Sequence, residues 1–319
     1  MKNVTVLMLI LSLIFVGCES NDDGETPVDF MVTSVTTPPT LDGVGGDAAW
    51  AEATTYLVKV GESEDYANAF GVVDVSLTAV KTATDLYLKA VWDDPSATES
   101  VAKNQWGYTG GAWEKTGNED RLFFFFDMGE NGSEGANCAT MCHTGGVQEG
   151  MWTANGIVDQ WHWKAARTAP INHADDKHIN NVYEGLGDGG QHGDAKTIGL
   201  YNDNKLDDMP KYTGPLTDGF LILPADSNAA DYFTPFNSST TTGSYKGYWL
   251  NENADGSRAD VTAYSNFSSG RWTVEFKRAL DTGNADDVVF GSGNIEMTMA
   301  ITDDSGGHHS GSAPFDMKF

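Results

Sequence analysis

Short runs in which apolar and polar residues alternate recur along most of the chain, and they constrain its fold more than any other feature. In one of them Val73, Val75 and Leu77 alternate with Asp74 and Ser76, which is the period of a strand with one buried face. Such β-rich runs cover residues 32–37, 55–60, 72–80, 85–92, 122–127, 220–223, 272–276 and 295–301. No long amphipathic helical pattern accompanies them, so the sequence predicts an all-β protein, an antiparallel β-sandwich with long inserted loops.

The inserted loops are predicted at residues 129–150 and 168–217, which are rich in Gly, Asn, Asp and His. Structureless loops longer than about 15 residues are uncommon in compact domains unless they have a function. The chain could hold one large β domain or two ordinary domains, because all-β units often run to about 200 to 250 residues. We predict one domain at residues 29–319. We expect its loops to hold a ligand at one end of the sandwich.

The first 28 residues have the pattern of an export signal and a tether. A basic start is followed by an apolar run to residue 16, which is too short for a membrane span of about 20 residues. Its end at Cys18 resembles the lipobox of bacterial lipoproteins, although Phe15 stands where Leu is usual. We predict a signal peptide at residues 1–17, lipidation of Cys18, a flexible acidic tether at 18–28 and an extracytoplasmic protein anchored to a bacterial membrane. A plain signal peptide is the alternative.

The charge balance excludes several classes of partner. The chain has 19 Lys and Arg against 46 Asp and Glu, a formal net charge of -27 and a pI near 4.3. Nucleic acids and anionic lipid headgroups would be repelled by such a surface. A soluble partner is therefore expected to be neutral or basic.

Cys138, Cys142 and His143 form a C-x-x-x-C-H string in a chain with three cysteines. It is one residue longer than the C-x-x-C-H string of covalent haem attachment. Two cysteines can form thioethers to one haem, and a histidine directly after the second can bind its iron. The string predicts a c-type haem held by Cys138 and Cys142, with His143 as the proximal iron ligand.

Three other interpretations of the same residues stay open. The two cysteines could form a short-loop disulfide, since an exported protein meets an oxidising environment. With His143 they could form half of a zinc site, although no second pair of ligands follows at finger-like spacing. The spacing could also be a coincidence.

Five segments together resemble a known haem-binding family. They cover residues 41–50, 85–95, 119–122, 159–165 and 272–280, and the W-x-W-K-A and V-E-F-K-R strings in the last two are the most specific. The family includes the gamma subunit of ethylbenzene dehydrogenase and the haem subunits of dimethyl-sulfide-type molybdenum enzymes. The resemblance implies a β-sandwich that carries one haem, moves single electrons and is not catalytic by itself. It also implies a redox partner, a molybdenum oxidoreductase or another cytochrome.

The resemblance bears on the iron ligands as well. In the gamma subunit a methionine and a lysine hold a non-covalent haem, whereas this chain is similar to family members with covalent haem, in which His143 would take one axial position. Lys277 resembles the family's lysine and is the first candidate for the distal position, provided that its amine is deprotonated. His308, beside His309, is the alternative, and Met151 is expected to pack.

Three residues around the W-x-W-K-A string are predicted to line the haem. Trp161 and Trp163 would form an aromatic wall, and Lys164 would lie near a propionate. His162, between the two tryptophans, is expected in the core or at the haem edge. A hydrophobic strand that ends in a lysine with an exposed head explains the same residues without a haem.

Two rival functions remain compatible with the sequence. An L-D-G, Asp, Trp opening also resembles carbohydrate-binding domains, in which tryptophan faces stack on sugars and the two cysteines would form a disulfide. A haem-based sensor with an open sixth position is the other rival. A visible spectrum separates these functions, because the sugar-binding domain has no Soret band and the open haem binds carbon monoxide.

Overall fold

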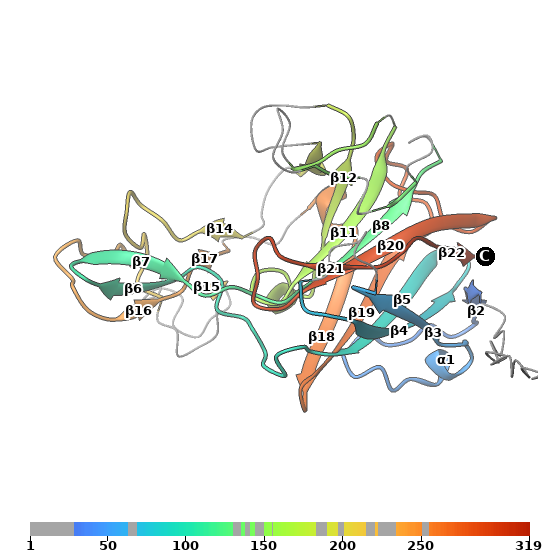
Figure 1. The fold of residues 1–319 in the computed structure, drawn as a ribbon, viewed down its shortest axis with the longest axis horizontal. Helices are drawn as coiled ribbons and strands as arrows, with labels where there is room; N and C mark the ends of the chain where they lie inside the picture. Colours follow the sequence, from blue (N-terminus) through green and yellow to red (C-terminus); the bar gives the residue numbers. More distant parts are fainter. Residues whose placement is uncertain are drawn as a thin grey trace, which may run out of the picture.

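Two β-sheets packed face to face form the body of the protein (Figure 1), and the all-β prediction is confirmed. The computed structural model describes residues 29–62, 69–129, 135–137, 141–143, 150–154, 156–182, 190–196, 201–214, 221–222, 234–250 and 255–319. Within these ranges the one α-helix is the short α1 (Ala48–Ala51). No helix in the described part of the chain is long and apolar enough to cross a membrane.

The first sheet has eight strands and contains the W-x-W-K string. Its order is β1 (Phe30–Met31), β22 (Phe315–Lys318), β20 (Asn294–Thr302), β8 (Arg121–Asp127), β11 (Val158–Lys164), β12 (Asp175–Ile179) and β13 (Gln191–Gly193), with β21 (Ser310–Gly311) beside β20. All of its pairings are antiparallel except that of the two-residue β1 with β22.

The second sheet has six strands and contains the V-E-F-K-R string. Its order is β18 (Thr262–Ser268), β19 (Arg271–Ala279), β5 (Asp85–Asp93), β4 (Val73–Lys81) and β2 (Thr33–Ser34), with β3 (Tyr56–Val60) also on β4. Only the pairing of the two-residue β2 with β4 is parallel. Strand alternation decides which side chains enter the core between the two sheets.

Aromatic side chains dominate that core. Phe124 of β8 contacts Phe276 of β19 edge to face, with 5.3 Å between ring centroids. Trp163 of β11 meets Trp272 of β19 at 4.9 Å, and Trp161 is likewise buried between the sheets. Each such ring removes a large apolar area from water, which stabilises the fold at roughly 25 cal/mol per Å².

The outer face of the second sheet is tied to the L-D-G turn. Glu275 of β19 is fully buried there and accepts hydrogen bonds from Trp50 Nε1 and from the Gly43 amide, both at 2.7 Å. Gly43 has a φ of +77°, and a Cβ at this position would lie 2.6 Å from the carbonyl carbon of Ser265. Only glycine fits both the backbone conformation and the close approach, which explains the motif structurally.

Two three-stranded sheets and one strand pair lie outside the sandwich. They are β6 (Gln105–Thr109) with β7 (Ala112–Thr116) and β16 (Ser244–Tyr245), then β14 (Asn202–Asp203) with β17 (Tyr248–Trp249) and β15 (Leu221–Ile222), and β9 (Cys142–His143) with β10 (Gly150–Met151). Figure 1 shows the first two sheets as an arm that extends from one end of the sandwich.

The long loop predicted at residues 168–217 is partly wrong. This segment contains β12 and β13 of the first sheet, β14, and the 3-10 helix η1 (Ala169–Ile171). A loop was predicted there because the segment is polar, but many of its Asp and His side chains are buried rather than solvated. The predicted signal peptide, tether and lipidated Cys18 lie outside the described residues.

Candidate functional site

The described part of the cysteine motif, Met141 with the backbone of Cys142 and His143, lies at the outer face of the first sheet, on the side away from the core. Cys142 and His143 form β9, which pairs with Gly150 and Met151 of β10. Cys138 lies outside the described residues, and only the backbone of Cys142 and His143 is described. The position of the motif is therefore given by Met141, whose amide donates to the Asn137 carbonyl at 3.1 Å.

Met141 anchors the motif on a small apolar cluster. Its fully buried side chain belongs to a cluster with Phe125 of β8 and with Met151. The other members of the cluster are Phe123, Ala136, Val158, Ile179 and Ala300. The neighbours of Phe125 in β8, Phe124 and Phe126, enter the core between the sheets, so this cluster covers the opposite, outer face of the first sheet.

A row of stacked rings leads from this cluster to His162. Phe125 and Phe123 of β8 lie parallel, with ring centroids 6.1 Å apart and an interplanar angle of 3°. Phe123 in turn stacks on the imidazole of His162 at 4.0 Å. His162 is directly opposite Phe123 in the register of β11 and β8, so backbone pairing fixes this contact.

His162 is buried, and neither of its ring nitrogens has a hydrogen-bond partner in the structure. Burial lowers the pKa of His162 well below its usual range, and four nearby cations lower it further. The four are Arg121, Lys164, Arg167 and Lys177. The imidazole is therefore neutral at physiological pH and keeps a free lone pair, which is the form that binds a metal.

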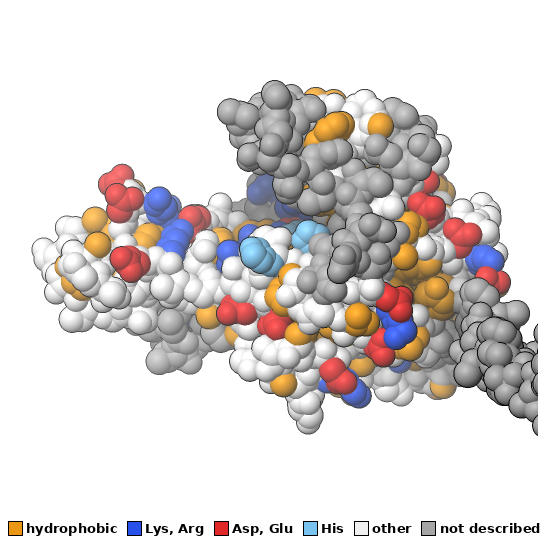
Figure 2. Space-filling model, in the orientation of Figure 1, with side chains coloured by type: hydrophobic (Ala, Val, Ile, Leu, Met, Phe, Trp, Pro, Cys, Tyr) orange, Lys and Arg blue, Asp and Glu red, His pale blue; other side chains and the backbone are white. Residues whose placement is uncertain are grey.

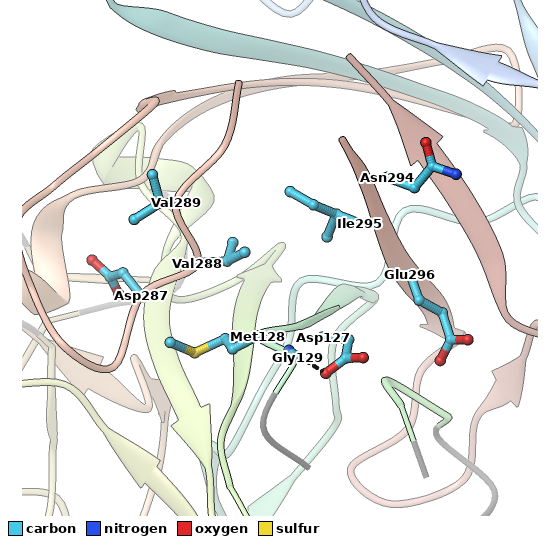
Figure 3. Close-up of a pocket in the computed structure, with 9 residues that line it drawn as sticks. All are labelled: Asp127, Met128, Gly129, Asp287, Val288, Val289, Asn294, Ile295 and Glu296. Atoms are coloured by element: carbon cyan, nitrogen blue, oxygen red, sulfur yellow. Dashed lines mark hydrogen bonds between the residues drawn. The ribbon is translucent and has the colours of Figure 1, made fainter. Parts of the chain in front are cut away.

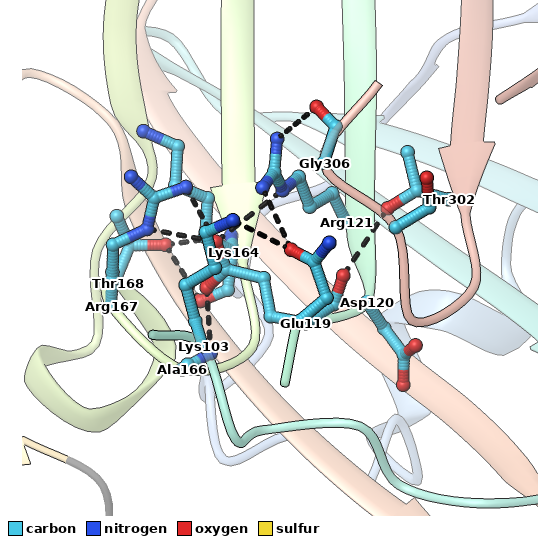
Figure 4. Close-up of polar contacts among 12 residues, drawn as sticks. Lys103, Glu119, Asp120, Arg121, Lys164, Ala166, Arg167, Thr168, Thr302 and Gly306 are labelled. Carbon is cyan, nitrogen blue, oxygen red and sulfur yellow. Dashed lines mark hydrogen bonds and ion pairs between the residues drawn. The ribbon is translucent and has the colours of Figure 1, made fainter. Parts of the chain in front are cut away.

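The cations around His162 form a cluster at the end of β11 (Figure 4). The ammonium group of Lys164 pairs with buried Asp175 and lies 2.5 Å from the Tyr201 hydroxyl. Arg258 pairs with the same carboxylate at 3.1 Å. Burial lowers the pKa of Lys164 well below its usual range, while Asp175 opposes that shift.

A second carboxylate orders the remaining arginines of the cluster. Buried Glu119 pairs with Arg167 at 2.5 Å and with Arg121 at 3.3 Å, and it accepts a hydrogen bond from the Ala166 amide. The Arg167 guanidinium also lies over the rings of Tyr201 and Tyr248, 5.2 and 5.3 Å from their centroids. These contacts fix the arginines in place before any ligand binds.

The cationic cluster contrasts with the rest of a strongly acidic chain. Acidic side chains are spread over the surface seen in Figure 2. The region around His162, by contrast, has five cationic side chains, which are Arg121, Lys164, Arg167, Lys177 and Arg258. The carboxylates that raise the pKa values of these groups number three, Glu119, Asp175 and Asp194. A buried surplus of positive charge is costly unless an anion compensates it. This part of the face is suited to an anionic ligand.

Lys277 is not brought to this face. It lies opposite Tyr87 in the register of β19 and β5, and Tyr87 packs with Trp50 on the outer face of the second sheet. There Lys277 is half-exposed and pairs with Asp85 at 3.3 Å. Both sheets and the core separate Lys277 from the cysteine motif, so one haem cannot reach both.

The two predicted wall residues also point elsewhere. Trp161 and Trp163 are buried in the core between the sheets, whereas their neighbours His162 and Lys164 point to the outer face. The two tryptophans therefore pack on the core side of β11 and do not line the site. Lys164 lies on the outer face with His162, where it pairs with Asp175.

His308 lies at the margin of the same face. It is exposed in the loop after β20, and the carbonyl of Gly306 in this loop accepts a hydrogen bond from Arg121 at 3.1 Å. The side chain of His309 is half-buried. Of the predicted distal candidates, the structure therefore brings His308 near the cationic cluster and leaves Lys277 on the other side of the sandwich.

Arg121, Arg167 and Arg258 were missed as site residues. Arg167 follows the W-x-W-K-A string after one residue, Ala166, so its proximity to Lys164 could have been noticed. Arg258 reaches the site from η3 (Ser257–Ala259), some 90 positions along the chain. No local pattern signals such a contact.

The fold and this face define a β-sandwich protein with a buried imidazole and a cluster of cationic side chains on the outer side of its first sheet. A family model described as ethylbenzene dehydrogenase matches residues 47–313. The chain therefore belongs to the ethylbenzene dehydrogenase family, which confirms the family predicted from the sequence. No curated protein matches the chain.

Two solved structures are similar in fold at a low level. One is a protein from Bacteroides uniformis described as carbohydrate-binding, with a TM-score of 0.37 and 7% identity over 91% of this chain and 89% of the other. The second is a family 9 carbohydrate-binding module from Caldicellulosiruptor kristjanssonii in complex with glucose, with a TM-score of 0.36 and 9% identity over 91% and 96%. These similarities are too weak to indicate what this chain binds.

Proposed function

We propose that the protein is a c-type cytochrome that transfers single electrons outside the cytoplasm. Cys138 and Cys142 would hold the haem, His143 would bind the iron on one side, and a lipid on Cys18 would anchor the chain to a bacterial membrane. The family supports a role as a redox subunit, since the matching model is that of ethylbenzene dehydrogenase. A partner oxidoreductase, a molybdenum enzyme or another cytochrome, would supply or accept the electron.

The observation that carries this proposal is the order of groups along the outer face of the first sheet. An apolar cluster under the cysteine motif is followed by the stacked Phe123, then by the unpartnered imidazole of His162, then by the cationic cluster. A haem has an apolar ring, an iron that takes an axial ligand and two carboxylates at one edge. The residues present therefore fit this group.

The chain would use each of these groups in a defined way. His162 would offer its neutral imidazole to the iron, in place of the predicted Lys277. Lys164 and the arginines would hold the propionates. Bound haem would supply one-electron oxidation and reduction, with a potential set by these ligands and by burial.

Carbohydrate binding finds less support in this structure. Stacking on a sugar requires an exposed aromatic face, as in tryptophan-rich binding surfaces. All nine tryptophans lie in the described part of the chain, and each of them is buried or half-buried. We therefore retain the cytochrome as the proposed function.

Replacing both cysteines tests the attachment. We expect a haem stain on a denaturing gel to colour the wild-type chain and to be lost completely in Cys138→Ala/Cys142→Ala, because thioether bonds survive denaturation and axial bonds do not. A wild-type protein without a Soret band, or with colour that leaves the chain on denaturation, would contradict covalent haem.

Replacing His162 tests the distal ligand. We expect His162→Ala to convert a six-coordinate, low-spin visible spectrum into a five-coordinate one that shifts on addition of carbon monoxide, and we expect added imidazole to restore the original spectrum. Lys277→Ala is the matched control and should keep the wild-type spectrum. A spectrum that survives in His162→Ala but is lost in His308→Ala would assign the distal position to His308 instead.

A further inference from the structure

A second group of buried side chains lies on the inner side of the first sheet, away from the proposed haem face. Asp159 of β11, Asp176 of β12 and Asp287 of the loop before β20 are each at most 3% exposed. One carboxylate oxygen from each residue lies within 4.8 Å of the others. Three separate segments of the chain therefore converge on one point.

One cation of the chain already contacts these carboxylates. Arg278 of β19 is fully buried and pairs with Asp159 at 2.5 Å and with Asp176 and Asp287 at 3.9 Å. Three carboxylates and one guanidinium leave two formal negative charges in the core. Such a charge must be neutralised by a counter-ion or by protons.

The clearest indication of a ligand is Asp176. Its side chain is 0% exposed, and neither of its carboxylate oxygens has a hydrogen-bond partner in the structure. Asp159 Oδ1 and Asp287 Oδ1 are also without a hydrogen-bond donor. Four buried carboxylate oxygens of this group thus have no donor, although buried polar atoms in folded proteins nearly always have partners.

The other oxygens of the group are held in place by the chain. Asp159 Oδ2 accepts from the Val288 amide at 3.0 Å, and Asp287 Oδ2 accepts from the Thr282 hydroxyl at 2.6 Å. Each of these carboxylates therefore has one oxygen fixed by the protein and one left over. This division is typical of metal ligands that are oriented by their surroundings.

We propose that Asp159, Asp176 and Asp287 form a binding site for a divalent cation, and that this cation is Ca²⁺. Oxygen ligands alone indicate a hard cation, and Ca²⁺ accepts several carboxylates at 2.3 to 2.6 Å in flexible geometry, whereas Mg²⁺ keeps most of its waters and uses one or two carboxylates. One divalent ion would also cancel the two uncompensated charges. The site is independent of the haem face and would bind its ion with or without haem.

A cavity lies beside the carboxylate group. Asp287 borders a cavity of about 360 Å³ that is also lined by Asp127, Met128, Val288 and Glu296. Figure 3 shows Asp287 at one side of this cavity, with Met128 extending toward it. The carboxylates of Asp127 and Glu296 in this cavity favour cations beside the group.

Without an ion, the group would have to take up protons. Burial raises the pKa of Asp159 to about 7 and holds the pKa of Asp176 well above its usual range. Protonation and Ca²⁺ binding are therefore alternative ways to neutralise the group. Only the second depends on the concentration of a metal.

Thermal unfolding of the purified protein, freed of metal with a chelator and then titrated with Ca²⁺ alone, tests the site. At a hundredfold excess over Kd, one bound ion should raise Tm by about 4 °C for a domain of this size. Asp176→Asn should lose this shift, while Asp93→Asn, which changes an exposed carboxylate paired with Arg271, should keep it. Tryptophan-sensitised terbium luminescence, displaced by Ca²⁺, gives an independent readout because Trp161 lies against Arg278.

Several results would overturn the proposal. The absence of a Ca²⁺-dependent shift in the wild type would mean that protons neutralise the group, and a full shift in Asp176→Asn would place the ion elsewhere. An equal shift with Mg²⁺ would reject the assignment to Ca²⁺. If Asp176→Asn does not fold, Asp287→Asn replaces it in the same comparison, with the same two outcomes.

Discussion

Arg278→Met is expected to destabilise the protein by about 3 to 5 kcal/mol at pH 7 in the presence of a chelator, because it removes the buried partner of three carboxylates. Arg278 donates to Asp159 and to the Val288 carbonyl, and its guanidinium lies 4.5 Å from the centroid of Phe290. Methionine replaces much of the apolar volume but none of the charge. The free energy of unfolding in urea measures the loss.

The pH dependence of this variant follows from the carboxylates. A carboxyl group whose folded pKa is raised binds more protons in the folded state than in the unfolded state, so stability falls as pH rises between its unfolded pKa, near 4, and its folded pKa, about 7 for Asp159. Removal of Arg278 should steepen this fall, and acid should partly rescue the variant. Arg271→Met, on the same strand but in an exposed pair with Asp93, should cost less than about 1 kcal/mol. Equal losses of unfolding free energy in Arg278→Met and Arg271→Met would contradict the role given to the buried charge of Arg278.

Asp175→Asn is expected to cost about 3 kcal/mol or more at pH 7, because it leaves Lys164 and Arg258 without their shared buried partner. Asp175 is fully buried and also accepts a hydrogen bond from the Tyr201 hydroxyl at 2.7 Å. Burial alone would raise the pKa of Asp175, but Lys164 and Arg258 hold it well below its usual range. Urea unfolding of wild type and variant at several pH values measures the effect.

For Asp175, the dependence of stability on pH has the opposite sign to that for Asp159. A carboxyl group with a depressed folded pKa contributes stability above its unfolded pKa, and that contribution is lost as pH falls. The difference in the free energy of unfolding between wild type and Asp175→Asn should therefore become smaller below about pH 4. Asp74→Asn is the control, since Asp74 pairs with Lys59 on the exposed surface. A difference that grows in acid would contradict this role for Asp175.

Strand periodicity was sufficient to predict the body of the fold. The predicted runs at 72–80 and 85–92 correspond to β4 and β5, and the runs at 122–127 and 295–301 correspond to β8 and β20. Strand β4 alternates apolar and polar residues because it buries one face in the core. The continuous apolar run of β8 reflects burial on both of its faces. Strand β12 escaped prediction because its sequence, DDKHI, buries charged side chains rather than apolar ones.

The site could be predicted only in part, since its groups come from distant segments. The cysteine motif and Lys164 were found because short strings mark them. His162 was expected in the core or at the haem edge but was not predicted as an iron ligand, because a sequence does not reveal that both ring nitrogens lack hydrogen-bond partners. Lys277 was favoured by resemblance, and its place on the second sheet depends on long-range strand pairing that no local string encodes.

Strand β11 contributes alternate residues to the two proposed sites. Asp159 faces the carboxylate group in the interior, while His162 and Lys164 face outward to the imidazole and cation positions. Deletion of a single residue from this strand would turn every later side chain to the opposite side. During evolution, changes in its length are therefore tolerable only in steps of two, and relatives that retain one site through such a change should retain the other.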